Sequence, residues 1–493
     1  MFFPEKSSKF TGMNEHNIIG RKEEIRKLKK CYESRMAQLV IVYGRRRVGK
    51  TFLVSELFRN RFALRLTGAF DQPKEVQLQH FADDLRHVYK PDLPTPATWQ
   101  EAFMQLRSFI ESRSSDERQV IFIDEIPWMD SPKSDFLPSF EYFWNSFGAQ
   151  QHNLMMIVCG SATAWMTENF ADNPGGLFNR HATRLYLHPF TLSETEEYLK
   201  SRHIEWSRYD IVECYMTMGG IPFYLNQLDE ELSYSANIDN LFFRQKGGLW
   251  DEFRHLYRTL FRNSDLYVRV VEALSAKKMG MTRSEISAAA KIPGNGDLTR
   301  VLANLVDSDF VRQYYFFGNK RKNMVYQLCD NYTLFYFRFI KDNYGRDERF
   351  WTNTLDSPAR KAWAGNAFEL VCKSHIQQIK RKLGILGVLS QDSVWFSKAG
   401  DSNGRGAQID MVIDRRDRVV NLCEIKYSIN PYSIDRDYEM QLRGKIEAFR
   451  EGTRSRSALH LTMITTYGVA RNAHSGIVQS VVTMDDLFVP YEY

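Results

Sequence analysis

Cysteine is scarce in this 493-residue chain, and its six cysteines show no pairing pattern. None is spaced C-x-x-C, and several lie within apolar runs. Disulfide frameworks and structural zinc sites need cysteines at characteristic spacings, so the sequence argues against both. The cysteines are Cys31, Cys159, Cys214, Cys329, Cys372 and Cys423. We expect buried, reduced thiols in a cytoplasmic protein.

Long apolar runs are also missing. No stretch approaches the roughly 18 apolar residues that a membrane-spanning helix needs, and the opening MFFPEKSSKF lacks the apolar core of a secretory signal. There is no internal repeat and no low-complexity tract. We therefore expect no membrane partner. At roughly 100–200 residues per domain, the length predicts about three domains.

Charge is nearly balanced, with a net +6, but it differs between the two halves of the chain. From Asp265 onward there are 33 Lys and Arg against 26 Asp and Glu, so the excess of positive charge lies in the C-terminal half. Two interpretations stay open: a polyanionic partner such as DNA, or a solvated basic surface.

Strand and helix patterns alternate over the first 190 residues. Buried strands are predicted at 37–44, 61–69, 118–126 and 153–162, and helices at 18–34, 73–90 and 98–113. This alternation predicts an α/β domain with a parallel sheet. From about 190 to 260 the pattern is helical throughout.

Three helices followed by a hairpin are predicted between 264 and 328, which is the order of a winged helix. Lys320, Arg321 and Lys322 at the hairpin tip and Arg300 on the third helix are candidate contacts to DNA phosphates. A purely structural or autoinhibitory unit is an equal alternative. The aromatic stretch 332–340 is predicted to be core.

The segment GRRRVGKT fits the pattern G-x-x-x-x-G-K-[ST] in full, between a predicted strand and a predicted helix. Its glycines let backbone N–H groups turn toward phosphate oxygens. Lys50 would reach the β and γ phosphates and contribute to catalysis, and Thr51 would offer a hydroxyl to Mg²⁺. The predicted nucleotide-binding residues are Gly44, Arg45, Arg46, Arg47, Val48, Gly49, Lys50, Thr51 and Phe52, with Asp124 and Ser161 downstream.

The strand VIFIDEI ends in two adjacent carboxylates. We expect Asp124 to hold Mg²⁺ and Glu125 to orient or deprotonate the attacking water. Ser161, after the next strand, is either a γ-phosphate sensor or part of a simple strand-to-helix turn. Arg180 and Arg184 are candidates for the arginine that stabilises transition-state charge in oligomeric NTPases, and we select Arg180. Either arginine is equally compatible with a surface ion pair.

Six segments carry a family resemblance: IIGRKEEI, GRRRVGKTFLVSEL, FIDEIPWM, GSATAWM, LFNRHATRLYLHPFTLSE and GGIPFYL. In this order they resemble the archaeal-type ATPase family, which belongs to the AAA+/STAND group of P-loop NTPases. The resemblance covers roughly residues 10–260 and implies an ATPase core followed by a helical lid, with GGIPFYL as the lid motif. The motif does not fix the position of the arginine finger.

Acidic residues recur near the C-terminus on a predicted helix and two predicted strands. Glu369 lies on the helix, Asp410 on the first strand, and Glu424 and Lys426 form E-x-K on the next, on one face of it. Asp410 and Glu424, with Glu369 nearby, can hold Mg²⁺, and the Ile425 carbonyl adds a hard ligand. Lys426 would stabilise charge at phosphorus.

This arrangement resembles the PD-(D/E)XK nuclease superfamily over roughly 360–470. The resemblance implies that Glu369, Asp410, Glu424 and Lys426 are catalytic, and Gln441 falls where many members place a glutamine. Degenerate relatives use this fold only for binding. The alternative is an α/β accessory domain with an exposed carboxylate strand.

Together the patterns predict four segments: an ATPase core (1–190), a helical lid (191–262), a winged-helix unit (263–345) and a nuclease-like domain (346–493). The first hypothesis is an ATP- and Mg²⁺-dependent switch coupled to DNA binding and DNA cleavage. The second is a signalling or assembly switch, with a homo-oligomer or a protein partner, whose C-terminal domain is catalytically inert.

Overall fold

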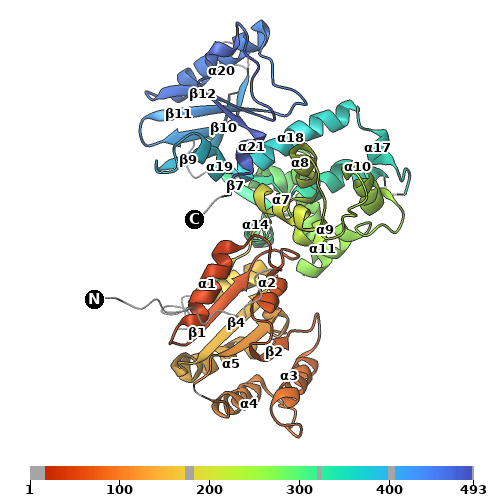
Figure 1. Ribbon diagram of the computed structural model, residues 1–493, viewed down its shortest axis with the longest axis vertical. Coiled ribbons are helices and arrows are strands. Elements are labelled where there is room, and N and C mark those ends of the chain that lie inside the picture. The colour runs from red at the N-terminus through yellow and green to blue at the C-terminus, as the bar shows by residue number, and fades with distance from the viewer. Residues whose placement is uncertain are drawn as a thin grey trace. The chain divides into compact units, whose positions relative to one another are not determined.

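The computed structural model describes residues 17–114, 116–171, 182–261, 263–318, 324–343, 345–397 and 406–490. The chain divides into two compact units, one ending at His188 and the other beginning at Pro189 (Figure 1). We call them unit 1 and unit 2. Among the described residues, no helix has the length and apolar character needed to cross a bilayer.

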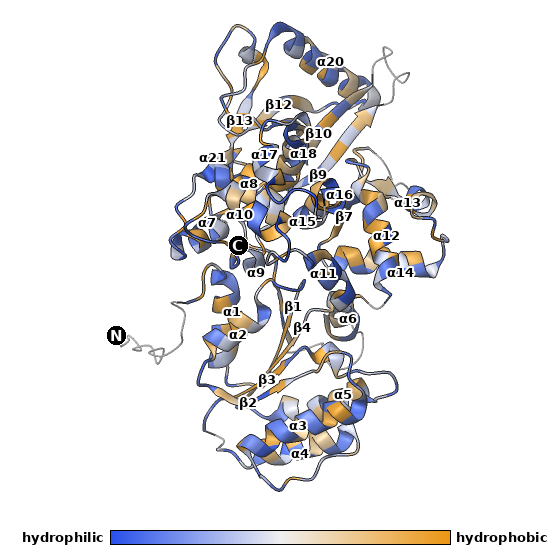
Figure 2. Ribbon diagram, turned by 90° about the vertical axis from the view of Figure 1, so that its right-hand side faces the viewer, coloured by the Kyte–Doolittle hydropathy of each residue, from blue (hydrophilic) through white to orange (hydrophobic). Residues whose placement is uncertain are grey.

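Unit 1 is built on a five-stranded parallel sheet with the order β2-β3-β4-β1-β5. Its strands are β1 (Gln38–Tyr43), β2 (Phe62–Thr67), β3 (Gln119–Asp124), β4 (Leu154–Gly160) and β5 (Ala182–Tyr186). The first four confirm the predicted strands. No strand is predicted at β5, because a short run with Arg184 in its middle lacks the apolar signal of the others. Figure 2 shows how hydrophobic β1 and β4 are along their length.

The helices of unit 1 cover both faces of this sheet. They are α1 (Lys22–Glu33), α2 (Lys50–Leu57), α3 (Lys74–Val88), α4 (Trp99–Glu111), α5 (Phe136–Ser146) and α6 (Thr163–Met166), with short turns η1 (Ile126–Trp128), η2 (Gly148–Gln150) and η3 (Thr167–Ala171). One buried cluster joins Ile41 and Ile121 of the sheet to Leu78, Phe103 and Phe140 of α3, α4 and α5. Strand β4 lies between β1 and β3, and the three strands are parallel. The segments that follow these strands therefore lie side by side at one edge of the sheet.

Unit 2 begins with helices, as predicted for 190–260. These are α7 (Leu192–Ser201), α8 (Arg208–Met218), α9 (Pro222–Leu225), α10 (Tyr234–Ile238), the turn η4 (Asp239–Phe243) and α11 (Glu252–Leu260). Gly219 and Gly220, the start of the GGIPFYL segment, both have positive φ where α8 ends. A Cβ on Gly220 would lie 2.3 Å from the Phe190 carbonyl oxygen, so the segment before α7 packs too closely for a side chain there.

The predicted winged-helix order is present in the next segment. It comprises α12 (Ser264–Ser275), β6 (Met281–Thr282), α13 (Arg283–Ala290), α14 (Gly296–Asp307), β7 (Val311–Tyr315) and β8 (Met324–Leu328), with the sheet order β6-β8-β7. Thr282 caps the N-terminus of α13, since its side chain accepts a hydrogen bond from the Glu285 N–H. The predicted contacts at the hairpin tip, Lys320, Arg321 and Lys322, lie outside the described residues.

The aromatic stretch 332–340 is helical and confirms the predicted core. It forms α15 (Asn331–Phe335) and η6 (Tyr336–Ile340), followed by α16 (Lys341–Asn343) and α17 (Phe350–Asn353). Phe335 and Phe339 are buried and pack edge-on against Trp351, and both also contact Trp363.

The last part of unit 2 holds a mixed five-stranded sheet with the order β13-β12-β11-β10-β9. Its elements are α18 (Pro358–Ser374), α19 (Ile376–Lys382), β9 (Ser390–Ser397), β10 (Ala407–Arg415), β11 (Val419–Lys426), α20 (Arg436–Thr453), β12 (Ala458–Thr465), η7 (Ser475–Ile477), β13 (Ser480–Thr483) and α21 (Met484–Leu487). Strands β9, β10 and β11 are antiparallel, whereas β11, β12 and β13 are parallel.

The helical segment that carries Glu369 breaks at His375, between α18 and α19. The buried ring of His375 bonds on both sides: Nδ1 lies 2.8 Å from the Val371 carbonyl oxygen, and Nε2 accepts the Leu192 N–H at 3.0 Å. The partner on α7 is remote in sequence, so periodicity alone could not reveal the break.

Candidate functional site

The loop between β1 and α2 can exist only with glycine at its two fixed positions. Gly44 has φ +137° and Gly49 φ +90°, both in the left-handed region. A Cβ on Gly44 would lie 2.4 Å from the Leu187 carbonyl oxygen. The loop therefore curls tightly at the edge of the sheet and places the first turn of α2 directly beside it.

Lys50 is the charged centre of this loop. Its side chain is buried, and Nζ donates to the carbonyl oxygens of Gly44 and Arg45, each at 2.9 Å. Burial lowers the pKa of Lys50, while the carboxylates of Asp124 and Glu125 act in the opposite direction. A desolvated ammonium held by backbone carbonyls is prepared for an anionic ligand, because phosphate oxygens would compensate its lost hydration.

Thr51 and Asp124 bring two hard oxygen donors together. The Thr51 hydroxyl donates to Asp124 Oδ2 at 2.8 Å, and the Glu125 N–H donates to Asp124 Oδ1 at 3.0 Å. Asp124 is the last residue of β3, and burial raises the pKa of its carboxyl. A hydroxyl and a buried carboxylate in contact are a donor set suited to Mg²⁺, which would also relieve the burial of the charge.

The backbone conformation of Glu125 is unusual for a residue with a side chain. Its φ of 48° lies in the left-handed region, which is costly for a residue with a side chain. The Ser161 hydroxyl donates to both Glu125 carboxylate oxygens, at 2.6 and 2.8 Å, and the Ser161 N–H lies 3.3 Å from Oε2. Hydrogen bonds thus connect Glu125, which follows β3, to Ser161, which follows β4.

The other predicted residues of the loop differ in exposure. Arg45 and Val48 are buried, Arg46 and Arg47 are half-buried, and Phe52 is exposed on α2. Arg21, in the segment IIGRKEEI, is a functional residue that was not predicted from the sequence. The buried Arg21 guanidinium donates to the Val48 carbonyl oxygen at 3.1 Å and so braces the loop. Its position in a Gly-Arg turn before the first helix was the one feature of the sequence that could have indicated this role.

Neither candidate for the arginine finger is found at this site in the part of the chain that the structure describes. Arg180 lies outside the described residues. Arg184 is exposed in the middle of the edge strand β5, where it is aligned with Ile41 of β1.

Comparison with known proteins decides the family. Residues 18–228 match the family described as an ATPase domain predominantly from Archaea. A short uncharacterized ATP-binding protein of Methanocaldococcus jannaschii is 44% identical over 44 residues, which are 9% of this chain and 75% of that protein. The chain belongs to this ATPase family.

Two further relatives span more of the ATPase. An uncharacterized protein of the same archaeon is 24% identical over 420 residues, which cover 83% of this chain and 87% of that protein. Among solved structures, the Walker-type ATPase of Pyrococcus abyssi is similar, with a TM-score of 0.46 and 18% identity over 66% of this chain and 98% of that one.

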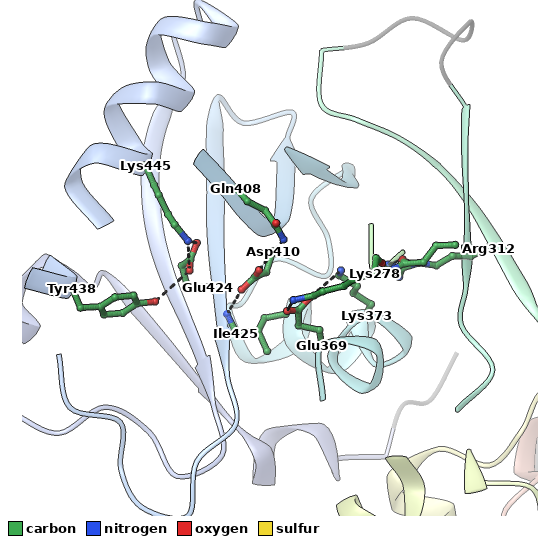
Figure 3. A network of polar contacts seen from close by, with 11 residues as sticks. Lys278, Arg312, Glu369, Lys373, Gln408, Asp410, Glu424, Ile425, Tyr438 and Lys445 are labelled. Atoms are coloured by element: carbon green, nitrogen blue, oxygen red, sulfur yellow. Dashed lines mark hydrogen bonds and ion pairs between the residues drawn. The ribbon is translucent and has the colours of Figure 1, made fainter. Parts of the chain in front are cut away.

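The acidic residues of unit 2 lie on neighbouring elements of the mixed sheet (Figure 3). Asp410 is on β10 and accepts the Ile425 N–H of β11 through Oδ2 at 3.1 Å, while Gln408 approaches Oδ1 at 3.5 Å. Asp410 is buried, as is Glu424 on β11. The structure therefore places Asp410 directly against the E-x-K strand.

Glu424 is held by the helix that follows its strand. Lys445 of α20 donates to both carboxylate oxygens at 2.7 Å, and the Tyr438 hydroxyl donates to Oε2 at 3.3 Å. The Lys426 ammonium lies 5.0 Å from the centre of the Tyr438 ring. Glu424 and Lys426 thus approach the same side chain of α20. Gln441, on the same helix, is exposed.

Glu369 is held by lysines from two segments. Lys278, in the turn after α12, pairs with Oε1, and Lys373 lies 3.6 Å from Oε2. Burial raises the pKa of Glu369, and the charge of Asp410 raises it further. The pKa of Lys373 falls to about 8 because of burial and the nearby Arg312 guanidinium.

The three carboxylates are thus neighbours that each have separate partners. Burial raises the pKa of Glu424 and the charge of Asp410 adds to the effect, so Asp410 acts on both glutamates. In the part of the chain that the structure describes, no three His, Cys, Asp or Glu side chains form a group that could hold a metal ion. Sequence reasoning missed Lys278, Lys373 and Lys445; only the i,i+4 spacing of Glu369 and Lys373 was a signal.

Proposed function

We propose that the ATPase is a nucleotide-controlled switch that hydrolyses ATP in unit 1 and binds and cleaves DNA with Mg²⁺ in unit 2. The observation that carries the second half is the hydrogen bond from the Ile425 N–H to Asp410. It fixes an acidic residue beside the E-x-K strand.

The ATP step follows from contacts in unit 1. Lys50 would exchange its carbonyl partners for β- and γ-phosphate oxygens, and Thr51 with Asp124 would hold Mg²⁺, which would neutralise phosphate charge. Glu125 would orient the attacking water and accept its proton. Ser161 holds the Glu125 carboxylate through two short hydrogen bonds, so a γ-phosphate that attracts the Ser161 hydroxyl would release Glu125 for this task.

Topology and charge support cleavage in unit 2. A helix carrying Glu369, three antiparallel strands carrying Asp410 and E-x-K, a helix and a parallel strand follow in the order that the PD-(D/E)XK resemblance implies. Asp410 lies close enough to both glutamates to raise their pKa values. A divalent cation on Asp410 and Glu424 would relieve this repulsion, and Lys426 would stabilise the phosphorus-centred charge.

DNA binding is supported by composition and by element order. The C-terminal half carries the excess of positive charge, and the segment from α12 to β8 has the winged-helix order with exposed Arg300 on α14. Arg300 pairs with Asp297 at 2.8 Å, an exposed pair that a DNA phosphate would displace at small cost.

One observation favours the alternative, a signalling or assembly switch with a catalytically inert C-terminal domain and a protein partner. The glutamates already have cationic partners, Lys445 for Glu424 and Lys278 and Lys373 for Glu369. Such pairing satisfies buried carboxylates without a metal.

A paired assay separates the two. ATP hydrolysis is measured with and without DNA, and DNA cleavage with Mg²⁺ or Mn²⁺, for the wild type, Lys50→Ala and Glu424→Gln. We expect Glu424→Gln to abolish cleavage while ATP hydrolysis survives, and DNA to stimulate hydrolysis. The exposed Arg443→Ala on α20 is the matched control. A wild-type protein that cleaves no DNA under any of these conditions would establish the inert alternative.

A further inference from the structure

We propose that unit 2 contains a second ligand site, a cavity that binds one nucleotide through its phosphate and its base. The cavity has a volume of about 440 Å³ and lies among α8, α12, α15, η6 and α18. Small-molecule sites typically measure roughly 300–1,000 Å³, so a single nucleotide is of suitable size. The cavity is distinct from the phosphate loop, which belongs to unit 1.

The charged side chains in the wall favour an anion. Lys277, Lys278 and Arg338 line the cavity, and Glu369 is the only carboxylate among the lining residues that the structure describes. Lys277 pairs with Glu285 and Lys278 with Glu369. Arg338 is exposed and makes no hydrogen bond or ion pair within the described residues. Its planar guanidinium suits a phosphate, which it can bind with two parallel hydrogen bonds.

Further cations lie behind this wall. The side chain of Lys373 is 8% exposed, and its ammonium lies 3.6 Å from the second Glu369 oxygen. Arg312 donates to the side chain of Gln327, which itself lines the cavity. Lys278, Lys373 and Arg312 all lie near Glu369 (Figure 3). This surplus of cations favours an anionic ligand in the cavity.

The uncharged part of the wall favours a base over a bare phosphate. Trp363 and Phe337 offer aromatic surface, and Asn331 offers an amide. Asn331 is 8% exposed; its amide N–H donates to the Tyr215 carbonyl at 3.0 Å, while its Oδ1 is buried without a hydrogen-bond partner in the described residues. An unsatisfied buried acceptor is costly, and an amino group of a base would satisfy it.

Ligand binding in this cavity would also change the ion pairs of Glu369. A phosphate that attracts Lys278 would leave Glu369 paired with Lys373 alone, and so would alter one of the three acidic residues of the candidate cleavage site. This consequence rests on the proposed function, whereas nucleotide binding itself does not.

The same chemistry can come from two sources, a free nucleotide or the phosphorylated 5′ end of a DNA strand. The test uses the full chain carrying Lys50→Ala, which removes phosphate binding at the loop of unit 1, in EDTA, which blocks metal-dependent cleavage. Binding of the four 5′-nucleoside monophosphates is measured by calorimetry. Binding of a short single strand with and without 5′-phosphate is measured by fluorescence anisotropy.

We expect one of the two phosphate-bearing probes to bind, and Arg338→Ala to weaken this binding tenfold or more. Lys341→Ala is the matched control: Lys341 is exposed three residues further along and pairs with Glu272, outside the cavity. Monophosphates that bind identify a free nucleotide, and binding of only the 5′-phosphorylated strand identifies a strand end.

The proposal is overturned if neither probe binds, or if binding is unchanged by both Arg338→Ala and Arg338→Gln in proteins with wild-type thermal unfolding. Equal binding of strands with and without 5′-phosphate, insensitive to Arg338, also overturns it, because that is general DNA affinity. None of these readouts depends on ATP hydrolysis or DNA cleavage, so failure here is distinct from failure of the proposed function.

Discussion

The phosphate loop of unit 1 and the acidic cluster of unit 2 satisfy their buried charges in different ways. Lys50 is held by two backbone carbonyl oxygens and Asp124 by the neighbouring Thr51 hydroxyl. In unit 2, Glu424 is held by Lys445 and Glu369 by Lys278, both of them side-chain cations.

A ligand must therefore displace different groups at the two sites. Neutral carbonyl and hydroxyl groups yield to a phosphate or a metal without leaving a charge uncompensated. A lysine that leaves a buried carboxylate must find new partners itself, and the carboxylate needs another cation. We therefore expect unit 1 to bind its ligand readily and unit 2 to bind a metal only when its lysines are displaced.

The largest expected effect is on ATP hydrolysis in unit 1. Lys50→Ala removes the one buried ammonium of the loop, and we expect kcat/KM for ATP to fall by at least about a hundredfold, as when a single charge-stabilising donor is deleted from an active site. Steady-state phosphate release measures it. Arg59→Ala, an exposed cation just after α2 that pairs with Glu56, should keep wild-type turnover. Turnover retained by Lys50→Ala would show that hydrolysis occurs elsewhere.

The next effect tests the lysine pairing in unit 2. Lys445→Ala leaves the carboxylate of Glu424, which is 1% exposed, without its cation, so we expect the free energy of unfolding to fall by about 3 kcal/mol at neutral pH. Urea unfolding measures it. Arg443→Ala, whose exposed pair with Glu439 is on the same helix, should change it by less than about 1 kcal/mol.

A metal titration sharpens this second prediction. If Glu424 is a metal ligand, Mn²⁺ should raise the Tm of Lys445→Ala more than that of the wild type, because the metal replaces the missing ammonium. Equal Tm shifts in both proteins would count against a metal at Glu424.

Because His375 is buried, we expect the stability of unit 2 to depend on pH. Burial lowers the pKa of His375 to about 4, below its ordinary value of about 6.5. Between about pH 6.5 and pH 4, the imidazole of His375 binds a proton in the unfolded chain but not in the folded chain. The free energy of unfolding therefore falls as the pH drops through this range, by roughly 1 kcal/mol per pH unit.

Urea unfolding of the wild type and His375→Gln across this pH range measures the effect, and the variant should lose this part of the slope. His255→Gln, an exposed histidine on α11, should keep it. The same slope in all three proteins would contradict a buried, neutral His375.

The smallest expected effect concerns Ser161. Ser161→Ala removes the hydroxyl that donates to both Glu125 oxygens, and hydrogen bonds to charged groups contribute about 1.5–3 kcal/mol. We expect kcat to fall about tenfold with little change in nucleotide affinity. Ser161→Thr retains the hydroxyl and should restore most activity. A large change in affinity would instead make Ser161 a direct ligand of the nucleotide.

Much of unit 1 was predictable because its signals are local. The strands that end at Tyr43, Asp124 and Gly160 are continuous apolar runs, and the loop at Gly44 and Gly49 has a fixed spacing. Strand β5 was missed because its register with β1 comes from tertiary pairing.

The phosphate loop, the Asp124–Glu125 pair, four of the five strands of the unit 1 sheet and the winged-helix order follow from the sequence alone. Glycine geometry, apolar periodicity and strand-end carboxylates act over a few residues, so their signals are local. Which cations face the acidic residues of unit 2 depends instead on tertiary packing. Lys278 and Glu369 are 91 residues apart, and their pairing follows from the packing of the turn after α12 beside α18. Long flexible lysines reach any carboxylate that folding places nearby, so no spacing in the sequence records the choice.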